Sequence, residues 1–196
     1  MTAPAPRFAQ FAWDRGCEWL LSHGPIEGPQ LLIVPPLFEE LNRMRRLIGD
    51  VMRALAAQGV GSHLPDLPGT GESDRRIEET GWEDWLAAVP AAARFAGATH
   101  VASLRGGALV DHGAGLPLWR FQPAEGAALL RDMTRARALT DPGFDEAAKQ
   151  ALFEAGPTEL GGYRVPPGLA RALNEARPAV VEGARVVRLA TDAKPA

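Results

Sequence analysis

The sequence predicts an α/β fold, in which a mostly parallel sheet carries helices on both faces and begins with an N-terminal β-hairpin. Short apolar runs alternate with helical patterns along the chain, which is the order that gives parallel strands joined by helices. Arg7–Trp13 and Cys17–His23 each alternate between apolar and polar residues, with Asp14-Arg15-Gly16 between them. This pattern is typical of two antiparallel strands joined by a tight turn.

Parallel strands are expected where a continuous apolar run stops at proline or glycine. Leu31–Val34 ends at Pro35-Pro36, and Thr99–Leu104 is followed shortly by Gly106 and Gly107. Two other segments are also predicted to be strands, Val60–Leu67 and Leu116–Phe121. A third segment, Ala184–Ala190, alternates between apolar and polar residues and is predicted to be the final strand. Together with the hairpin, these segments form the predicted sheet.

Helices are expected where apolar residues recur at helical spacing. Glu39–Ala57 shows this spacing, and Gly59 follows as a helix-ending glycine commonly does. Four further helices are predicted: Trp82–Phe95, Ala124–Leu139, Phe144–Glu154 and Gly168–Ala176. Gly156–Pro167 is rich in glycine and proline and is expected to be a lid or surface loop. Residues 1–196 are interpreted as one domain, in which about residues 140–180 form a lid or cap segment.

Composition excludes several classes of function. The net charge of −3 gives no basic field for nucleic acid, and no run is long and apolar enough to span a membrane. The single cysteine, Cys17, excludes an internal disulfide and a thiolate metal cluster and fits a reducing compartment. The first ten residues lack the pattern of a signal peptide. We therefore expect a cytoplasmic protein.

Ligands of parallel α/β sheets bind beyond the carboxyl ends of the strands. Three loops of this chain are placed there, namely Pro35–Arg46, Asp66–Asp74 and Ser103–Gly107. Asp66-Leu67-Pro68-Gly69-Thr70-Gly71-Glu72-Ser73 resembles a turn found after an early strand in many members of the α/β-hydrolase superfamily.

The resemblance is closest to the exosortase A system-associated hydrolase 2 group. It is carried by Pro35-Pro36-Leu37-Phe38-Glu39-Glu40-Leu41-Asn42-Arg43-Met44-Arg45-Arg46 and by Ser103-Leu104-Arg105-Gly106-Gly107. Leu118-Trp119-Arg120-Phe121-Gln122-Pro123 and Gly161-Gly162-Tyr163 are similar to further pieces of that group. The resemblance runs from about residue 7 to residue 190 and implies association with exopolysaccharide production and protein sorting. Compared with the group, this chain is shortened after Gly107, because only Gly106–His112 stands where a full helix is expected.

Arg105 holds the position at which a hydrolase of this fold carries its nucleophile. The tip of such a turn has small residues two positions before and after it. These are Ser103 and Gly107 if Arg105 is the tip, but Val101 and Arg105 if Ser103 is the tip. Sterics therefore favour Arg105, which is always charged and cannot attack a carbonyl.

The usual catalytic triad is not identifiable. In this fold a histidine near the C-terminus follows the nucleophile and the acid. The four histidines are His23, His63, His100 and His112, and none follows residue 112. Ser103 and Asp66 are left as weak catalytic candidates, although an aspartate at a strand end is more often a turn-former.

A polar pocket is predicted around Arg105. Its other members come from the segment after the third strand: Glu39, Glu40, Asn42 and Arg46. Glu39 or Glu40 is expected to face Arg105 across the carboxyl end of the sheet, which would make a site for an anionic or polar ligand. The alternatives are a solvated first helical turn and a purely structural ion pair.

No cofactor and no metal site is predicted. Gly69-Thr70-Gly71-Glu72-Ser73-Asp74 lacks the third glycine of a dinucleotide fingerprint and the lysine of a Walker loop. The histidines do not fall at metal-ligand spacing.

Tyr163 follows two glycines and is expected either to gate a pocket or to anchor a surface loop.

Two main hypotheses of function follow. The first is a non-catalytic or divergent accessory protein of hydrolase fold that binds a small anionic or polar ligand. The second is an active hydrolase of ester, thioester or glycan substrates that uses Asp66, Ser103 or a glutamate of the Glu39-Glu40 pair. A homodimer formed through the sheet edge near Ala190 is a third hypothesis.

Overall fold

The computed structural model describes residues 5–189 of the chain and contains a seven-stranded sheet in the order β1-β2-β4-β3-β5-β6-β9. The pairs β1–β2 and β2–β4 are antiparallel, and every pair from β4 to β9 is parallel. The strands are β1 (Arg7–Trp13), β2 (Gly16–His23), β3 (Gln30–Val34), β4 (Gly61–Pro65), β5 (His100–Leu104), β6 (Leu118–Phe121) and β9 (Arg185–Val187). The predicted fold class, including the N-terminal hairpin, is confirmed. The end of the predicted strand at Ala190 lies outside the described residues.

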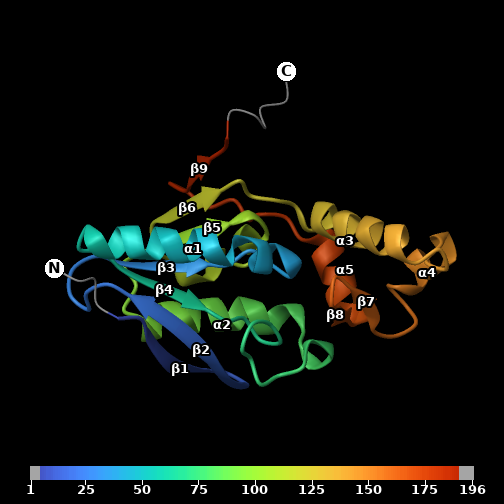
Figure 1. Ribbon diagram of the computed structural model, residues 1–196, viewed down its shortest axis with the longest axis horizontal. Helices are drawn as coiled ribbons and strands as arrows, with labels where there is room; N and C mark the ends of the chain where they lie inside the picture. The colour runs from blue at the N-terminus through green and yellow to red at the C-terminus, as the bar shows by residue number, and fades with distance from the viewer. Residues whose placement is uncertain (1–4, 190–196) are drawn as a thin grey trace.

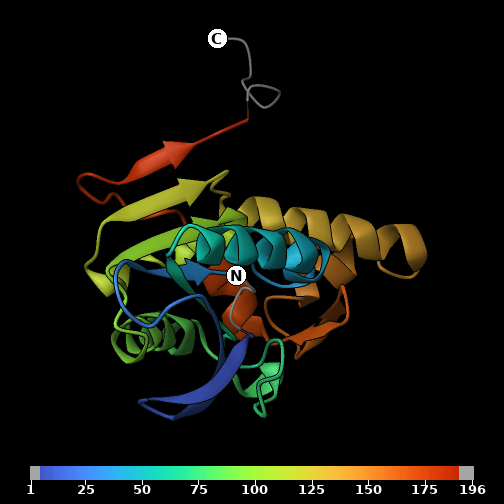
Figure 2. The same ribbon diagram turned by 60° about the vertical axis from the view of Figure 1, so that its left-hand side comes forward.

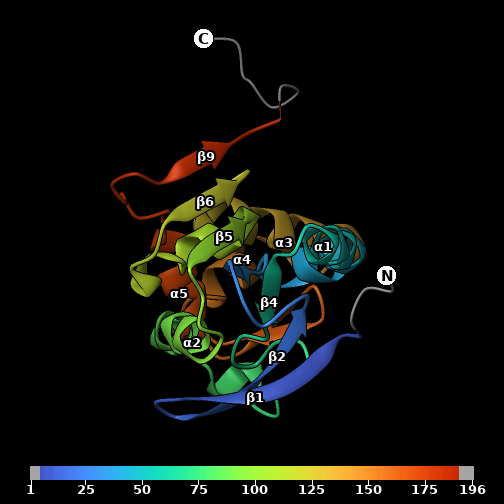
Figure 3. The ribbon, with the colours of Figure 1, turned by 90° about the vertical axis from the view of Figure 1, so that its left-hand side faces the viewer.

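Helices cover both faces of this sheet, as Figure 3 shows for α1 (Glu39–Ala57) and α2 (Trp82–Phe95). The alternation of β3 explains the arrangement. Ile33 packs with Ile48 and Met52 of α1, whereas Leu32 and Val34 belong to the larger cluster that contains Trp85 of α2. A buried parallel strand needs apolar residues on both faces, which is why Leu31–Val34 is continuously apolar.

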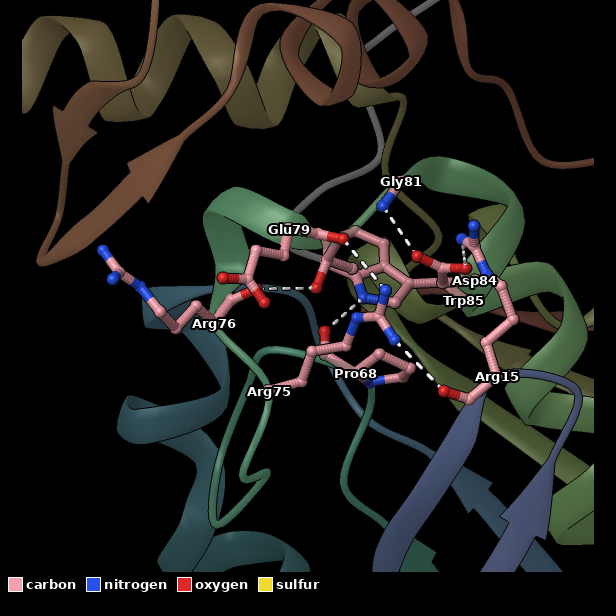
Figure 4. A network of polar contacts seen from close by, with 9 residues as sticks. Arg15, Pro68, Arg75, Arg76, Glu79, Gly81, Asp84 and Trp85 are labelled. Carbon is pink, nitrogen blue, oxygen red and sulfur yellow. Dashed lines mark hydrogen bonds and ion pairs between the residues drawn. The ribbon is translucent and has the colours of Figure 1, made fainter.

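Polar contacts fix the turn of the β1–β2 hairpin to the start of α2 (Figure 4). Arg15 pairs with Asp84, which is 1% exposed and also accepts a hydrogen bond of 2.8 Å from the backbone N–H of Gly81. Arg75 donates to the Arg15 carbonyl over 3.3 Å. These bonds satisfy a helix N-terminus and position the loop after β4.

Residues 126–175 lie at one end of the sheet in Figures 1 and 2. They contain α3 (Gly126–Thr140), α4 (Glu146–Ala151), β7 (Thr158–Leu160), β8 (Tyr163–Val165) and α5 (Pro167–Glu175). The prediction that Gly156–Pro167 is a surface loop is wrong, because this segment contains the antiparallel hairpin β7–β8. Leu160 and Val165 are fully buried, so the hairpin gains the apolar contacts that a short hairpin needs. That residues 140–180 act as a lid or cap stays a prediction.

No helix within residues 5–189 has both the length and the apolar character needed to cross a bilayer.

Candidate functional site

Backbone strain gathers at the carboxyl ends of the parallel strands. Among the described residues, three that are not glycine have a positive φ: Phe38 (56°), Arg105 (52°) and Gln122 (49°). Arg105 and Gln122 directly follow β5 and β6, and Phe38 precedes α1 shortly after β3. Side chains are disfavoured in this conformation, and such residues concentrate at functional sites. The three loops therefore meet at the edge where ligands of this fold class bind.

Arg105 lies at the tip of the turn after β5, at the start of the 3-10 turn η2 (Arg105–Leu109). The chain is packed closely there. A Cβ atom on Gly107 would lie 2.7 Å from the carbonyl oxygen of Val34 and closer still to that of Pro35. The small residue two positions after Arg105 is thus required by the close approach of β3. We name the turn that begins at Arg105 the elbow turn; it is a short 3-10 turn rather than a full helix.

Arg105 and Glu40 form an ion pair across this edge. The Nε and Nη2 atoms of Arg105 donate to a single oxygen, Oε1 of Glu40, over 3.0 and 2.8 Å. The side chains are 36% and 25% exposed, respectively. The contact joins the elbow turn to the first turn of α1, whose N-terminus favours an acidic residue. Of the two glutamates predicted to face Arg105, the structure brings Glu40 to it.

The second carboxylate oxygen of Glu40, Oε2, is buried and has no hydrogen-bond partner among residues 5–189. A cavity of about 100 Å³ lies beside it, between the start of α1 and α3. Its charged lining is Glu39, Glu40, Asp132 and Arg43. A buried, unpaired carboxylate oxygen costs free energy, so a hydrogen-bond donor entering this cavity would stabilise it.

The other predicted pocket residues lie farther from the ion pair. Glu39 accepts hydrogen bonds of 3.2 and 2.8 Å from Arg43 on its own helix. Asn42 accepts from Arg45 over 3.3 Å and hydrogen-bonds the hydroxyl of Tyr163. Arg46 is not brought to the site, because its side chain is 95% exposed and its ion-pair partner, 4.0 Å away, is Asp50. Whether any of these residues binds a ligand stays a prediction.

Tyr163 belongs to β8 and packs edge-on against Phe38, with ring centroids 5.4 Å apart. Burial raises the pKa of its phenol, and the hydrogen bond with Asn42 opposes this rise. The contact connects the hairpin β7–β8 to the loop before α1. Tyr163 therefore anchors a secondary-structure element, in agreement with the anchoring alternative.

Ser103 is fully buried and belongs to a polar network. Its hydroxyl donates to Oδ2 of Asp111 over 2.6 Å. Arg120 binds the same carboxylate with two hydrogen bonds of 2.8 and 2.6 Å, and it donates a third, of 2.6 Å, to the Ala179 carbonyl. No histidine hydrogen-bonds Ser103 among residues 5–189. Sequence reasoning missed Asp111 and Arg120, because only the pairing of β5 with β6 places Arg120 beside Ser103.

Asp66 forms the turn after β4. Its Oδ2 accepts a hydrogen bond of 3.2 Å from the backbone N–H of Glu72, and the carboxylate packs against Gly71. Burial raises the pKa of Asp66. Glu18 of β2, which is 2% exposed, also has a raised pKa, mainly because it is buried and partly because Asp66 is negative. Asp66 further lines a surface cavity of about 760 Å³.

His63 lies in a second buried network, at the amino end of the parallel strands. Its Nδ1 and Nε2 atoms lie 2.8 Å from the Ser22 hydroxyl and from Oε1 of Gln30, respectively. Because Oε1 of Gln30 can only accept, Nε2 carries the proton and Nδ1 accepts from Ser22. Asp66 is not among the hydrogen-bond partners of His63 within residues 5–189, which are Ser22 and Gln30. Among the described residues no group of three or more metal-ligating side chains is positioned to hold a metal ion.

Neither a protein-family model nor a curated protein matches this sequence. Solved structures do resemble it. A protein from Agrobacterium vitis S4 named as a hydrolase has a TM-score of 0.57 and 14% identity over 88% of this chain and 72% of its own. Est1E from Butyrivibrio proteoclasticus, with ferulic acid bound, has a TM-score of 0.58 and 20% identity over 86% and 71%. A thioesterase domain from the curacin biosynthetic pathway has a TM-score of 0.54 and 15% identity over 87% and 74%.

These similarities show the fold alone. The chain has an α/β-hydrolase fold, and Arg105 begins the turn after β5. That this turn stands in place of a nucleophile elbow stays a prediction.

Proposed function

We propose that this protein is a non-catalytic accessory protein of α/β-hydrolase fold, linked to exopolysaccharide and exosortase systems, that binds a polar or anionic ligand at Arg105. One observation carries the proposal: the strained tip of the elbow holds an arginine that is already paired with Glu40. The link to exopolysaccharide and sorting systems rests on the resemblance of the two loop sequences. The exposed, single Cys17 supports a cytoplasmic location.

The loss of catalysis follows from the chemistry of the side chains. A guanidinium keeps its positive charge at all relevant pH values and is not a nucleophile. The serine nearest to it in sequence, Ser103, is fully buried and its proton is engaged with Asp111. A substrate carbonyl would have to enter this packed network before Ser103 could attack it. The elbow turn therefore carries a permanent positive charge and no accessible nucleophile.

The ligand class follows from the unused donors and acceptors. Glu40 occupies the Nε and Nη2 atoms of Arg105, which leaves Nη1 on a side chain that is 36% exposed. A carboxylate or phosphate oxygen would accept from Nη1 in a charge-assisted hydrogen bond. Oε2 of Glu40 would accept from a hydroxyl of the same ligand. An acidic sugar carries both groups.

The test compares binding and turnover in one preparation. We expect glucuronate to raise the melting temperature of the wild-type protein and glucose to do so less. Arg105→Gln should abolish the difference, whereas Arg46→Gln, which removes an exposed arginine outside the site, should keep it. A panel of ester, thioester and glycoside substrates should give no turnover. Turnover that disappears in Ser103→Ala while the protein remains folded would refute the proposal.

An active hydrolase with a non-standard constellation is the alternative, and one observation favours it. Glu18 and Asp66 both have pKa values raised by burial, and Asp66 lines a cavity of about 760 Å³. A carboxyl group with a raised pKa is suited to general acid catalysis, and glycoside hydrolysis pairs one such acid with a second carboxyl group that is ionised. Glycoside turnover lost in both Glu18→Gln and Asp66→Asn would establish this alternative.

The homodimer remains a proposal. It is supported by β9, which is the edge strand of the sheet and exposed along its whole length. An open edge offers unpaired backbone groups to a second copy. Light scattering at several protein concentrations measures the mass directly, and a monomer at all of them would exclude the dimer.

A further inference from the structure

A group of three cations lines a cavity away from Arg105, between helices α3, α4 and α5. These helices line an open cavity of about 470 Å³ at the surface, which is within the size range of small-molecule sites. Arg131 and Arg135 of α3 and Lys149 of α4 line it. No carboxylate is among its lining residues, so the cavity has a positive potential.

The two arginines have no ion-pair partner among residues 5–189, and they are placed one helical turn apart. Like charges at this spacing repel each other and destabilise a helix. Lys149 has a partner, Glu146, at 2.5 Å, but the side chain of Glu146 is 85% exposed and lies on the same helix. A bound anion would therefore be attracted by the three cations that line the cavity, and no carboxylate shares that lining.

The rest of the cavity is apolar. Leu130 and Leu152 are buried, with exposed fractions of 4% and 1%, and they form its floor with Phe153. Leu139 continues this surface outward and is 83% exposed. Transfer of a hydrocarbon tail from water onto such a surface is favourable, at roughly 25 cal/mol per Å² of area removed. Thr134 and Asn174 add two neutral polar groups to the rim.

We infer that this cavity binds an amphiphilic anion, with a carboxylate or phosphate head held by Arg131, Arg135 and Lys149 and an apolar tail against Leu130, Leu152 and Phe153. Neither half of the lining alone selects such a ligand. The cations attract any anion, and the apolar floor attracts any hydrocarbon. Their junction in one cavity favours molecules that carry both. This site is separate from the one proposed at Arg105.

Calorimetry with octanoate tests the inference, with octanol and acetate as probes that lack the charge and the tail. We expect octanoate to bind at least about tenfold more tightly than either probe. Arg131→Gln/Arg135→Gln should weaken octanoate binding by about tenfold or more, and Leu152→Gln should weaken octanoate without affecting the weak response to acetate.

Two further variants locate the binding. Arg46→Gln controls for loss of an exposed arginine and should bind octanoate normally, and Arg105→Gln should also bind it normally. Equal affinity for octanol and octanoate would overturn the inference, and so would an Arg131→Gln/Arg135→Gln variant that binds as the wild type does. Loss of binding in Arg105→Gln alone would assign octanoate to the elbow and would overturn the inference too.

Discussion

Arg105 donates two hydrogen bonds to one oxygen of Glu40 and thereby joins the elbow turn after β5 to the first turn of α1. The two residues are 65 positions apart in the sequence. The pair lies at the carboxyl ends of the parallel strands β3 and β5. Because both side chains are partly exposed, solvent screens the interaction, and its contribution to stability is small.

A double-mutant cycle on Arg105 and Glu40 should give a coupling energy of about 0.5–1 kcal/mol. Arg105→Gln alone leaves a glutamate with one buried oxygen and no cation beside it, so we expect it to destabilise the protein. The double variant Arg105→Gln/Glu40→Gln should recover part of the stability that Arg105→Gln alone loses. Urea unfolding of the four proteins measures the cycle. Additive effects would show that the pair makes no net contribution.

Replacement of Arg120 should be far more damaging. Arg120→Met would leave the carboxylate of Asp111, which is fully buried, without its cation and should cost about 3–5 kcal/mol. Ser103→Ala removes one neutral donor and should cost about 1 kcal/mol. Urea unfolding again provides the measurement. A loss below about 1 kcal/mol in Arg120→Met would mean that water reaches Asp111.

Stability should fall when the pH drops below about 6.5, in part because of His63. Burial lowers the pKa of His63 from its usual 6.5. As the pH falls through 6.5, the unfolded chain binds a proton before the folded protein does, so its free energy decreases relative to the folded state. The stability that neutral His63 contributes is fully present above pH 6.5. It is lost progressively as the pH falls from 6.5 to the pKa of His63 in the folded protein.

Unfolding free energies of the wild type and of His63→Gln between pH 5 and 8 test this effect, at about one-unit steps. The variant should lose stability overall but show a shallower fall below pH 6.5. His112→Gln is the matched control, since His112 is exposed, and should keep the wild-type slope. Equal slopes in His63→Gln and the wild type would contradict the assignment. His23, whose pKa is also lowered by burial, contributes to the slope in the same direction.

Gly107→Ala should destabilise the protein by about 1–3 kcal/mol, because the new methyl group would overlap backbone carbonyl oxygens that cannot move freely. Gly113→Ala is the matched control. Its Cβ would have no neighbour nearer than 3.6 Å, so the substitution should be close to neutral. Thermal unfolding compares the two. An equal effect of both substitutions would mean that the elbow is packed less tightly than the geometry indicates.

Much of the fold could be predicted because local patterns encode it. The helices over Glu39–Ala57 and Trp82–Phe95 have the bounds that their apolar spacing predicts, and the strand Arg7–Trp13 matches as well. The hairpin β7–β8 could not be predicted from its glycines and prolines. Leu160 and Val165 become buried only when other elements pack on them, so the local sequence contains no signal for their burial.

The sequence by itself predicted a turn after the strand Thr99–Leu104 with Arg105 at its tip, from the small residues Ser103 and Gly107 on either side, and the structure starts the turn at Arg105. It also predicted that a glutamate of the Glu39-Glu40 pair would face Arg105. The tertiary structure decided which one, and it placed Arg46 in solvent. It also enclosed Ser103 in a network with Asp111 and Arg120, and it gathered Arg131, Arg135 and Lys149 around one cavity. The direction of each of these side chains is set by the rotation of its helix about the helix axis or by the register of its strand. Both depend on the packing of segments that are distant in the sequence.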